Sequence, residues 1–151
     1  MVRCDRTFDL ALIKRTMTHR RIYPYICDDG APPAEAFSPI DNPLIYYLQM
    51  SDSEHLGVFM LHPHNTVCFE VHTCLLPHAW GETARQCTRE GTRWMFDNTP
   101  CRRIITNVPQ YNRLALKLAL ESGMSQFGVN PKSFLKDGKL CDQIMLGISK
   151  E

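Results

Sequence analysis

Residues 66–128, TVCFEVHTCLLPHAWGETARQCTREGTRWMFDNTPCRRIITNVPQYNRLALKLALESGMSQFG, decide the fold that this sequence predicts. The pattern indicates a strand, a turn with one glycine, an amphipathic helix, a second strand, and a helix between Asn112 and Gly123. Short connections between strand and helix favour parallel strands joined by a right-handed crossover. The same order directs the free amides of the first helix toward the end of the first strand, where phosphate groups are commonly bound.

Other segments add strands and helices on both sides of this unit. Strands are expected at residues 2–5, 44–50, 55–61, 66–76, 103–108, 124–129 and 140–148. Helices are expected at 7–17 with Thr7 as the N-cap, at 22–26, at 82–96, and at 112–122, the last of them largely buried. Residues 31–43 are rich in proline and predict a loop, and Lys136-Asp137-Gly138-Lys139 predicts a hairpin turn. The sequence therefore predicts one α/β domain over 1–151, with a mixed, mostly antiparallel sheet of six to seven strands and about four helices.

The composition describes a nearly neutral chain of single-domain size. Seventeen basic and sixteen acidic residues among 151 give a formal net charge of +1, which argues against binding to nucleic acid or membranes through charge. The seven cysteines show no C-x-x-C spacing, which fits a reducing compartment. The N-terminal segment mixes acidic and basic side chains with short apolar runs, so neither a signal peptide nor a spanning helix is expected. A cytoplasmic protein is predicted.

The strand at 66–76 carries the candidate catalytic residues. Side chains alternate along a strand, and one face of this strand holds Cys68, Glu70, His72 and Cys74. An ionisable group on a mostly buried strand is costly unless it is paired or used. Glu70 and His72 are therefore candidates for acid–base chemistry, although each also suits a structural role in a hydrogen-bonded network.

The same strand face suggests zinc, with His62 and His64 assisting from the preceding turn. Alternate residues on a strand lie about 7 Å apart, too far for four ligands from one strand to close a tetrahedron on one ion. No metal site is therefore expected.

A set of residues between about 55 and 148 has an order and spacing more specific than any one member. The set comprises Glu70-Val71-His72, Pro77-x-x-Trp80-Gly81, Trp94-Met95-Phe96, Arg103-Ile104, Asn107, Asn112-x-x-Ala115, Gly123-Met124 and Asp142. Together these residues resemble the cofactor-binding half of the GNAT acyl-CoA N-acyltransferases. The resemblance is greatest to the branch that acetylates the N-termini of ribosomal proteins and to small GNAT-like proteins of tailed phages. It implies that two central parallel strands splay apart, with 1–43 on the acceptor side and 44–151 forming the sheet and cofactor-binding half.

The resemblance also implies an activity, the transfer of an acetyl group from acetyl-CoA to an amine by direct attack in a ternary complex. Glu70 matches the base of many members, with His72 beside it. Backbone groups near Cys74, Leu75 and Leu76 would pair with the pantetheine arm. The other cofactor contacts would come from the turn residues His78, Ala79, Trp80, Gly81, Glu82, Thr83, Ala84 and Arg85 around the pyrophosphate, and from Asn107 and Asn112 at the far end.

Three positions depart from the family's pattern. The phosphate-binding turn usually reads R/Q-x-x-G-x-G/A, whereas this chain has His78 first and Thr83 last. Members with a tyrosine proton donor carry it seven residues after the helix asparagine, where this chain has Ala119. These departures favour the rival interpretation of a non-catalytic binding or assembly protein on the same scaffold, for instance a phage-encoded one acting in the host cytoplasm.

The acceptor and partners are predicted only in outline. Residues 19–43 would shape the acceptor side, where Asp28 and Asp29 suit an amine, whether on a protein or on a small molecule. Edge strands in this architecture often pair between subunits, so a homodimer is one expectation. A third interpretation, a small metal-dependent nucleic-acid-binding module, is opposed by the near-neutral charge.

Overall fold

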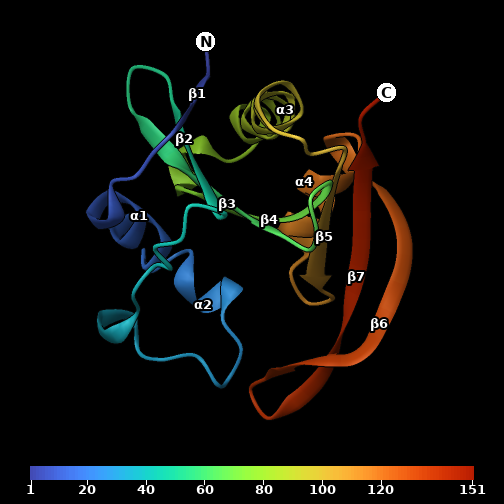
Figure 1. The fold of residues 1–151 in the computed structure, drawn as a ribbon. Coiled ribbons are helices and arrows are strands. Elements are labelled where there is room, and N and C mark those ends of the chain that lie inside the picture. The colour runs from blue at the N-terminus through green and yellow to red at the C-terminus, as the bar shows by residue number, and fades with distance from the viewer.

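The computed structural model describes residues 1–151 as one seven-stranded sheet with helices on both faces (Figure 1). The strands are β1 (Arg3–Arg6), β2 (Tyr46–Ser51), β3 (His55–Pro63), β4 (Cys68–Leu75), β5 (Arg103–Pro109), β6 (Ser125–Lys136) and β7 (Lys139–Ser149). The helices are α1 (Leu10–Met17), α2 (Tyr23–Ile26), α3 (Glu82–Asn98) and α4 (Arg113–Glu121), with short 3-10 turns η1 (Ala34–Ala36) and η2 (Pro77–Ala79). None of the helices combines the length and the apolar composition that crossing a membrane requires.

The sheet has the strand order β1-β2-β3-β4-β5-β7-β6. Every pair of neighbours is antiparallel except β4 and β5, which are parallel. The connection between these two strands runs through α3, because parallel neighbours need a crossover rather than a tight turn. The prediction of an α/β protein with a mixed, mostly antiparallel sheet is therefore confirmed.

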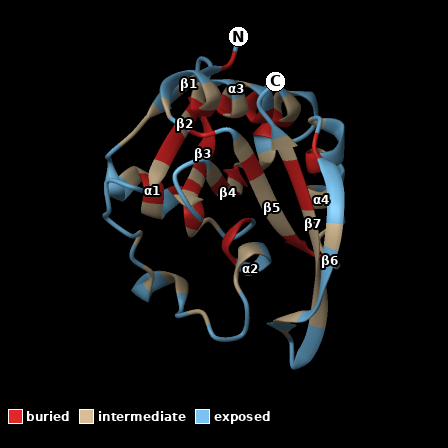
Figure 2. Ribbon diagram, turned by 45° about the vertical axis from the view of Figure 1, so that its right-hand side comes forward, coloured by how far each residue is buried: buried red, intermediate tan, exposed pale blue.

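Buried side chains form two clusters on opposite faces of the sheet. The larger cluster packs α3 and α4 against the sheet through residues such as Phe59, Val71, Leu75 and Met95. The smaller cluster packs the α1–α2 segment against β2, β3 and β4, and contains Ile13, Met17, Ile22, Tyr47, Val58 and Cys74. Figure 2 shows buried residues concentrated in the middle of the sheet, whereas β6 is largely exposed. The C-terminal end of β4 therefore lies between two helical layers.

Local hydrogen bonds set the start of two helices. The N-cap of α1 is Asp9, whose carboxylate accepts a hydrogen bond from the amide of Leu12 at 3.0 Å. The predicted cap, Thr7, was wrong; its hydroxyl instead accepts from the amide of Asp9. The N-cap of α4 is Asn112, whose side-chain oxygen accepts from the amide of Ala115 at 3.2 Å.

Two segments differ from the sequence prediction. Only Ala119 of α4 is buried, whereas Leu114 and Leu120 are exposed, so the prediction of a largely buried helix was wrong. Leucines at every second position spread around a helix instead of forming one apolar stripe. The final hairpin is also longer than predicted, because β6 and β7 stay paired as far as a turn in which Asp137 and Gly138 have φ of 52° and 75°.

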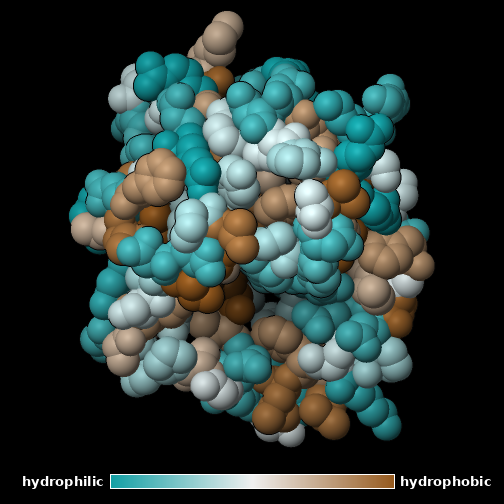
Figure 3. Space-filling model, viewed as in Figure 1, coloured by the Kyte–Doolittle hydropathy of each residue, from teal (hydrophilic) through white to brown (hydrophobic).

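The β6–β7 hairpin extends beyond the body of the sheet. Phe127, Val129, Leu135 and Leu140 are exposed along it. Figure 3 shows hydrophobic side chains gathered at the lower edge of this face, where Figure 1 places the tip of the hairpin. Because β6 is an edge strand, pairing of two copies along it stays a prediction.

Candidate functional site

The parallel strands β4 and β5 separate partway along their length. Their pairing covers only three residue pairs and ends at Glu70 and Ile105. Just beyond this point the hydroxyl of Thr106 donates to the carbonyl of Val71 at 3.1 Å. The rest of β4, as far as Leu75, has no partner on the β5 side, as expected for a splayed central pair.

The direction of the hydrogen bonds shows which β4 groups face this gap. The amide of Leu76 donates to the carbonyl of Leu56 on the β3 side, at 2.9 Å. Directions alternate along a strand, so Cys74 and Leu76 point their backbone groups at β3. Thr73 and Leu75 point theirs at the gap. The expected pantetheine contacts of Cys74 and Leu76 therefore do not fit, and the Cys74 side chain is itself fully buried.

The turn between β4 and α3 presents unpaired amides. Gly81 precedes α3 with φ of 94°, in the left-handed region that glycine adopts without strain. The amides of residues 81–84 donate to no backbone or side-chain acceptor. A Cβ added at Gly81 would meet no atom within 4 Å, so the backbone there borders open space. The positive end of a long helix thus faces a region where an anion fits.

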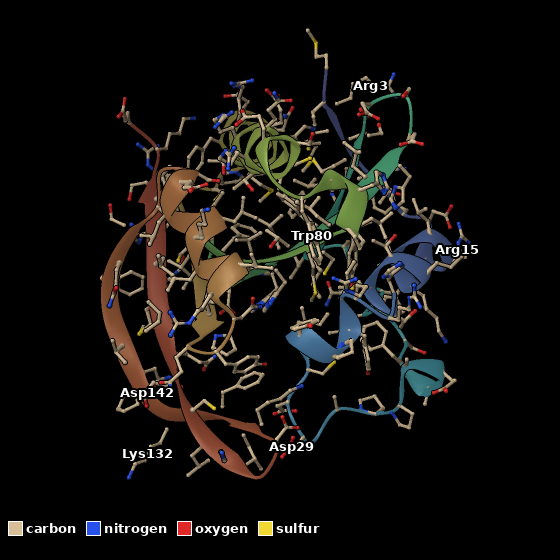
Figure 4. The ribbon with its side chains drawn as sticks, turned by 180° about the vertical axis from the view of Figure 1, so that it is seen from behind. Arg3, Arg15, Asp29, Trp80, Lys132 and Asp142 are labelled. Carbon is tan, nitrogen blue, oxygen red and sulfur yellow. The ribbon has the colours of Figure 1, made fainter.

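Trp80 connects this turn to the N-terminal helices. Its indole Nε1 donates to the carbonyl of Leu75 at 2.9 Å, which fixes the end of β4. The guanidinium of Arg21 lies over its ring, 5.3 Å from the centroid. Figure 4 shows Trp80 at the centre of the face, between the α1–α2 segment and the α3–α4 pair.

A cavity of about 280 Å³ lies beside the turn, bounded by the α1–α2 segment, the end of β4, the start of α3, and α4. Six of the predicted residues line it: Leu75, Trp80, Gly81, Ala84, Arg85 and Asn112. The wall also contains residues that were not predicted, among them Arg21, Thr73, Leu114, Lys117, Leu118 and Glu121. The α4 residues were missed because leucines at close spacing indicate core packing, and no local signal shows that α4 borders a cavity.

Other predicted residues lie away from this cavity. The side chain of His78 points to the β2–β3 turn, with Nε2 3.7 Å from Glu54 Oε2. Asn107 interacts with the carboxylate of Glu70 and does not line this cavity, so its contact with the far end of the cofactor stays a prediction. Glu82 and Thr83 do not line this cavity, although their backbone amides are unpaired. Ala119 is buried in the larger cluster and presents no group to the gap.

Arg85 is held by two carboxylates at the cavity wall. Its guanidinium lies 2.8 Å from Glu82 Oε2 and 2.7 Å from Glu121 Oε2. Both glutamates raise the pKa of Arg85, so it stays charged. This cation is close to the unpaired amides, but the two carboxylates offset its charge at the wall.

Glu70 lies among three histidines. His64 Nε2 is 2.9 Å from Glu70 Oε1. Glu70 Oε2 lies 3.4 Å from His72 Nε2 and 3.9 Å from His62 Nε2. The sequence prediction placed His62 and His64 in a turn, whereas β3 continues to Pro63 and pairs His62 directly with Glu70. Cross-strand register brings this set together, and no local pattern predicts it.

These neighbours set the charge of Glu70. Burial raises the pKa of Glu70, but the hydrogen bond from His64 and the nearby His72 outweigh it, so the pKa lies below its ordinary value. Burial lowers the pKa of His72, and the opposing effect of the Glu70 charge is smaller. At neutral pH the site therefore contains a carboxylate beside a neutral imidazole.

No protein-family model matches the sequence, and no curated protein sequence is significantly similar to it. Solved structures are similar in fold. The spermidine N-acetyltransferase from Vibrio cholerae in complex with CoA and spermine gives a TM-score of 0.79 at 19% identity, over 99% of this chain and 94% of that chain. A chimera of the V. cholerae spermidine N-acetyltransferase SpeG and hSSAT gives a TM-score of 0.80 at 17% identity, over 98% of this chain and 95% of that chain.

At sequence identities of 17% and 19%, the similarity to these structures establishes a shared fold only. The seven-stranded order, the single parallel pair and its early separation agree with the architecture that the sequence motifs predicted. The narrower resemblance to ribosomal-protein acetyltransferases and phage proteins stays a prediction. The chain has the fold of the GNAT N-acyltransferases.

Proposed function

We propose that this protein is an N-acetyltransferase that transfers an acetyl group from acetyl-CoA to an amine. One juxtaposition carries the proposal: the unpaired amides of residues 81–84 lie beside the open backbone of Thr73 and the free amide of Leu75, whose carbonyl accepts from Trp80. The first group suits a diphosphate and the second suits the amides of a pantetheine arm. The fold is shared with N-acetyltransferases, one of which was crystallised with CoA.

The residues present fit acetyl-CoA, which supplies the reactive thioester. Residues 81–84 would hold its diphosphate through their amides. The positive side chains of Arg85 and Lys117 on the cavity wall suit its phosphates, and Leu114 offers an apolar surface. Thr73 would align the pantetheine by backbone hydrogen bonds, as in the addition of a strand to a sheet edge.

The attacking amine must be neutral, so a base has to remove its proton. Glu70 is an ionised carboxylate near the point where β4 and β5 separate, and its side chain is only 12% exposed. It would accept the proton directly or through one water. A backbone amide facing the gap, from Thr73 or Leu75, suits polarisation of the thioester carbonyl. With Ala119 at the position of the family's tyrosine, water would protonate the departing thiolate.

The acceptor in this proposal is a small polyamine-like amine. The similar enzymes are spermidine N-acetyltransferases, and one was crystallised with spermine. Exposed carboxylates follow α2 at Asp28, Glu35 and Asp41, and would attract a molecule with several positive charges.

A second candidate is a binding protein without catalysis. The buried Ala119 and the Cβ of Thr83 at the phosphate turn favour it. Such a protein would release no free thiol from acetyl-CoA with any amine.

Thermal unfolding with acetyl-CoA is the first test. A ligand at 100 times its Kd adds about 2.7 kcal/mol to the free energy of unfolding, so the midpoint should rise by several degrees. Thiol release with spermidine is the second test. Glu70→Gln should keep the midpoint shift and slow thiol release by about 100-fold. Glu90→Gln should change neither, because Glu90 pairs with Arg93 on α3 away from the cavity.

Each outcome separates the two candidates. No midpoint shift at millimolar acetyl-CoA would reject the acetyltransferase proposal. A shift without thiol release from the wild-type protein, across several amines, would favour the binding protein. Full turnover by Glu70→Gln would remove Glu70 from the role of base.

A further inference from the structure

Three side chains from neighbouring strands converge on one point. His62 comes from β3, and Glu70 and His72 come from β4, with their donor atoms all within 4.8 Å of one another. The separations are 3.2 Å between His62 Nε2 and His72 Nε2, 3.4 Å between His72 Nε2 and Glu70 Oε2, and 3.9 Å between His62 Nε2 and Glu70 Oε2. The two imidazoles are about one-third exposed, so solvent reaches this point.

The distances between these donor atoms are similar to those between neighbouring ligand atoms in a metal site. In a tetrahedral zinc site with ligands about 2.0–2.1 Å from the ion, neighbouring donor atoms lie roughly 3.3 Å apart. The triangle formed by the three atoms has a centre about 2 Å from each of them. One ion there would reach all three donors with little movement of the side chains.

The sheet holds the three donors in place. His62 lies directly opposite Glu70 in the β3–β4 register, and His72 is two residues further along the same face. The rings of His62 and His72 have planes within 16° of each other and centroids 5.3 Å apart, with their Nε2 edges facing. Donors on paired strands are positioned more firmly than donors on loops.

His64 supports the carboxylate from the side. Its Nε2 donates to Glu70 Oε1 at 2.9 Å, which leaves Oε2 for an ion. A hydrogen bond to the second oxygen of a ligating carboxylate is the usual outer contact of a metal centre. In contrast, His62 and His72 point their Nε2 atoms at each other, 3.2 Å apart, and only one of the two nitrogens can donate a proton to the other. A bound cation would use both lone pairs.

We propose that His62, Glu70 and His72 bind a divalent transition-metal ion, with His64 as the hydrogen-bonded support of the ligating carboxylate. Two imidazoles and one carboxylate are a donor set that Zn²⁺ accepts, and its fourth position would hold water. The sequence argument against a metal considered four alternate residues on one strand, with His62 and His64 assisting only from a turn. The structure instead supplies ligands from two strands.

Metal binding and amine deprotonation would use the same carboxylate. An ion on Glu70 Oε2 therefore lowers the rate of the acetyl transfer proposed above. Binding of the ion needs no acetyl-CoA, so it is measured on the protein alone, and the two proposals fail separately.

The test uses the full chain after a chelator has removed any bound metal. Zn²⁺ binding is measured by titration calorimetry, and Co²⁺ binding by absorption spectroscopy. We expect one ion per chain and the visible bands of four-coordinate Co²⁺. His62→Gln and His72→Gln should each weaken Zn²⁺ binding by more than about 100-fold, and His64→Gln by about 10- to 100-fold. His19→Gln is the control, because that ring accepts from the amide of Arg21 outside the cluster.

Seven free cysteines make a second readout necessary. A Co²⁺–thiolate charge-transfer band would show that cysteines bind the ion, and would overturn the proposal. Unchanged Zn²⁺ affinity in His62→Gln, with a wild-type circular dichroism spectrum, would also overturn it. If His72→Gln fails to fold, His62→Gln still decides the question.

Discussion

The carboxylate of Asp29 accepts a hydrogen bond from the amide of Gly138, with 2.9 Å between Oδ2 and the nitrogen. Its other oxygen accepts from the amide of Asp137 at 2.8 Å, and the amide of Asp29 donates to the carbonyl of Leu135. These contacts attach the loop after α2 to the tip of the β6–β7 hairpin, as Figure 4 shows for Asp29. The hydrogen bonds from Gly138 and Asp137 lower the pKa of Asp29. The attachment holds α2 at the cavity wall.

Asp29→Ala should release this attachment. The amides of Asp137 and Gly138 lose their acceptor, so their hydrogen exchange should become faster by on the order of tenfold. The KM for the amine should rise, while the thermal shift with acetyl-CoA should stay, because the phosphate turn lies on α3. Asp97→Ala, an exposed aspartate of α3, is the matched control. Unchanged exchange at Gly138 would show that the carboxylate does not hold the hairpin.

Local signals explain why the central unit was predictable. Pro77 ends β4, Gly81 supplies the positive φ before α3, and Asn112 caps α4, and each of these effects acts within a few residues. The alternation of side chains likewise placed Glu70 and His72 on one face. Sequence therefore indicated the strand–helix–strand order and the place of the phosphate turn.

Contacts between distant segments were not predictable in the same way. Alternation assigns side chains to faces, but it does not tell which neighbouring strand the backbone of Cys74 faces, so the sequence predicts Cys74 where the structure has Thr73. The position of His62 opposite Glu70 depends on the register of two strands. The attachment of Asp29 to Gly138 joins residues far apart in the chain. The longer hairpin depends on β6–β7 pairing that continues past two register shifts.

Asn112 has two roles that separate by substitution, since it caps α4 and lines the cavity. Asn112→Ala should lower the free energy of unfolding by about 1 kcal/mol through loss of the cap. Asn112→Asp keeps a capping oxygen and should keep the stability, but its negative charge should weaken acetyl-CoA binding severalfold. Urea unfolding and calorimetry measure the two effects. Equal acetyl-CoA affinity for Asn112→Asp and the wild-type protein would place the phosphates away from this residue.

Gly81→Ala tests whether the phosphate turn needs an open approach. The left-handed φ should cost about 1–2 kcal/mol of stability, and the new methyl group should project into the space that a diphosphate would fill. Acetyl-CoA binding should fall at least about tenfold. Gly138→Ala is a matched control, because it too has positive φ and open space, at the hairpin tip. A loss of stability without any loss of affinity at Gly81 would place the ligand elsewhere.

His55 predicts a dependence of stability on pH. The hydroxyl of Thr16 donates to the carbonyl of Leu12, so its oxygen accepts from His55 Nε2 at 2.8 Å. His55 Nδ1 in turn accepts from the side-chain Nε2 of Gln49. Burial lowers the pKa of His55 below its ordinary 6.5, and the charge of Arg15 adds to this.

Because the folded pKa is the lower one, the unfolded chain binds the proton more readily. The contribution of His55 is complete above about pH 6.5 and is lost as the pH falls through the folded pKa. Urea unfolding should therefore show lower stability at about pH 5.5 than at about pH 7.5. His55→Gln should reduce this difference and His19→Gln should not. An identical difference in His55→Gln would assign the effect to other groups.

The pair formed by Arg85 and Glu121 predicts a gain of function by substitution. Both residues line the cavity, 2.7 Å apart, and the glutamate both repels a phosphate and occupies the arginine. Glu121→Gln should strengthen acetyl-CoA binding about three- to tenfold, whereas Arg85→Gln should weaken it about tenfold. In the double variant the gain should shrink, because the glutamate acts partly through the arginine. Calorimetry at low salt gives the four affinities, and weaker binding by Glu121→Gln would mean that the pair positions Arg85 for the ligand instead of withholding it.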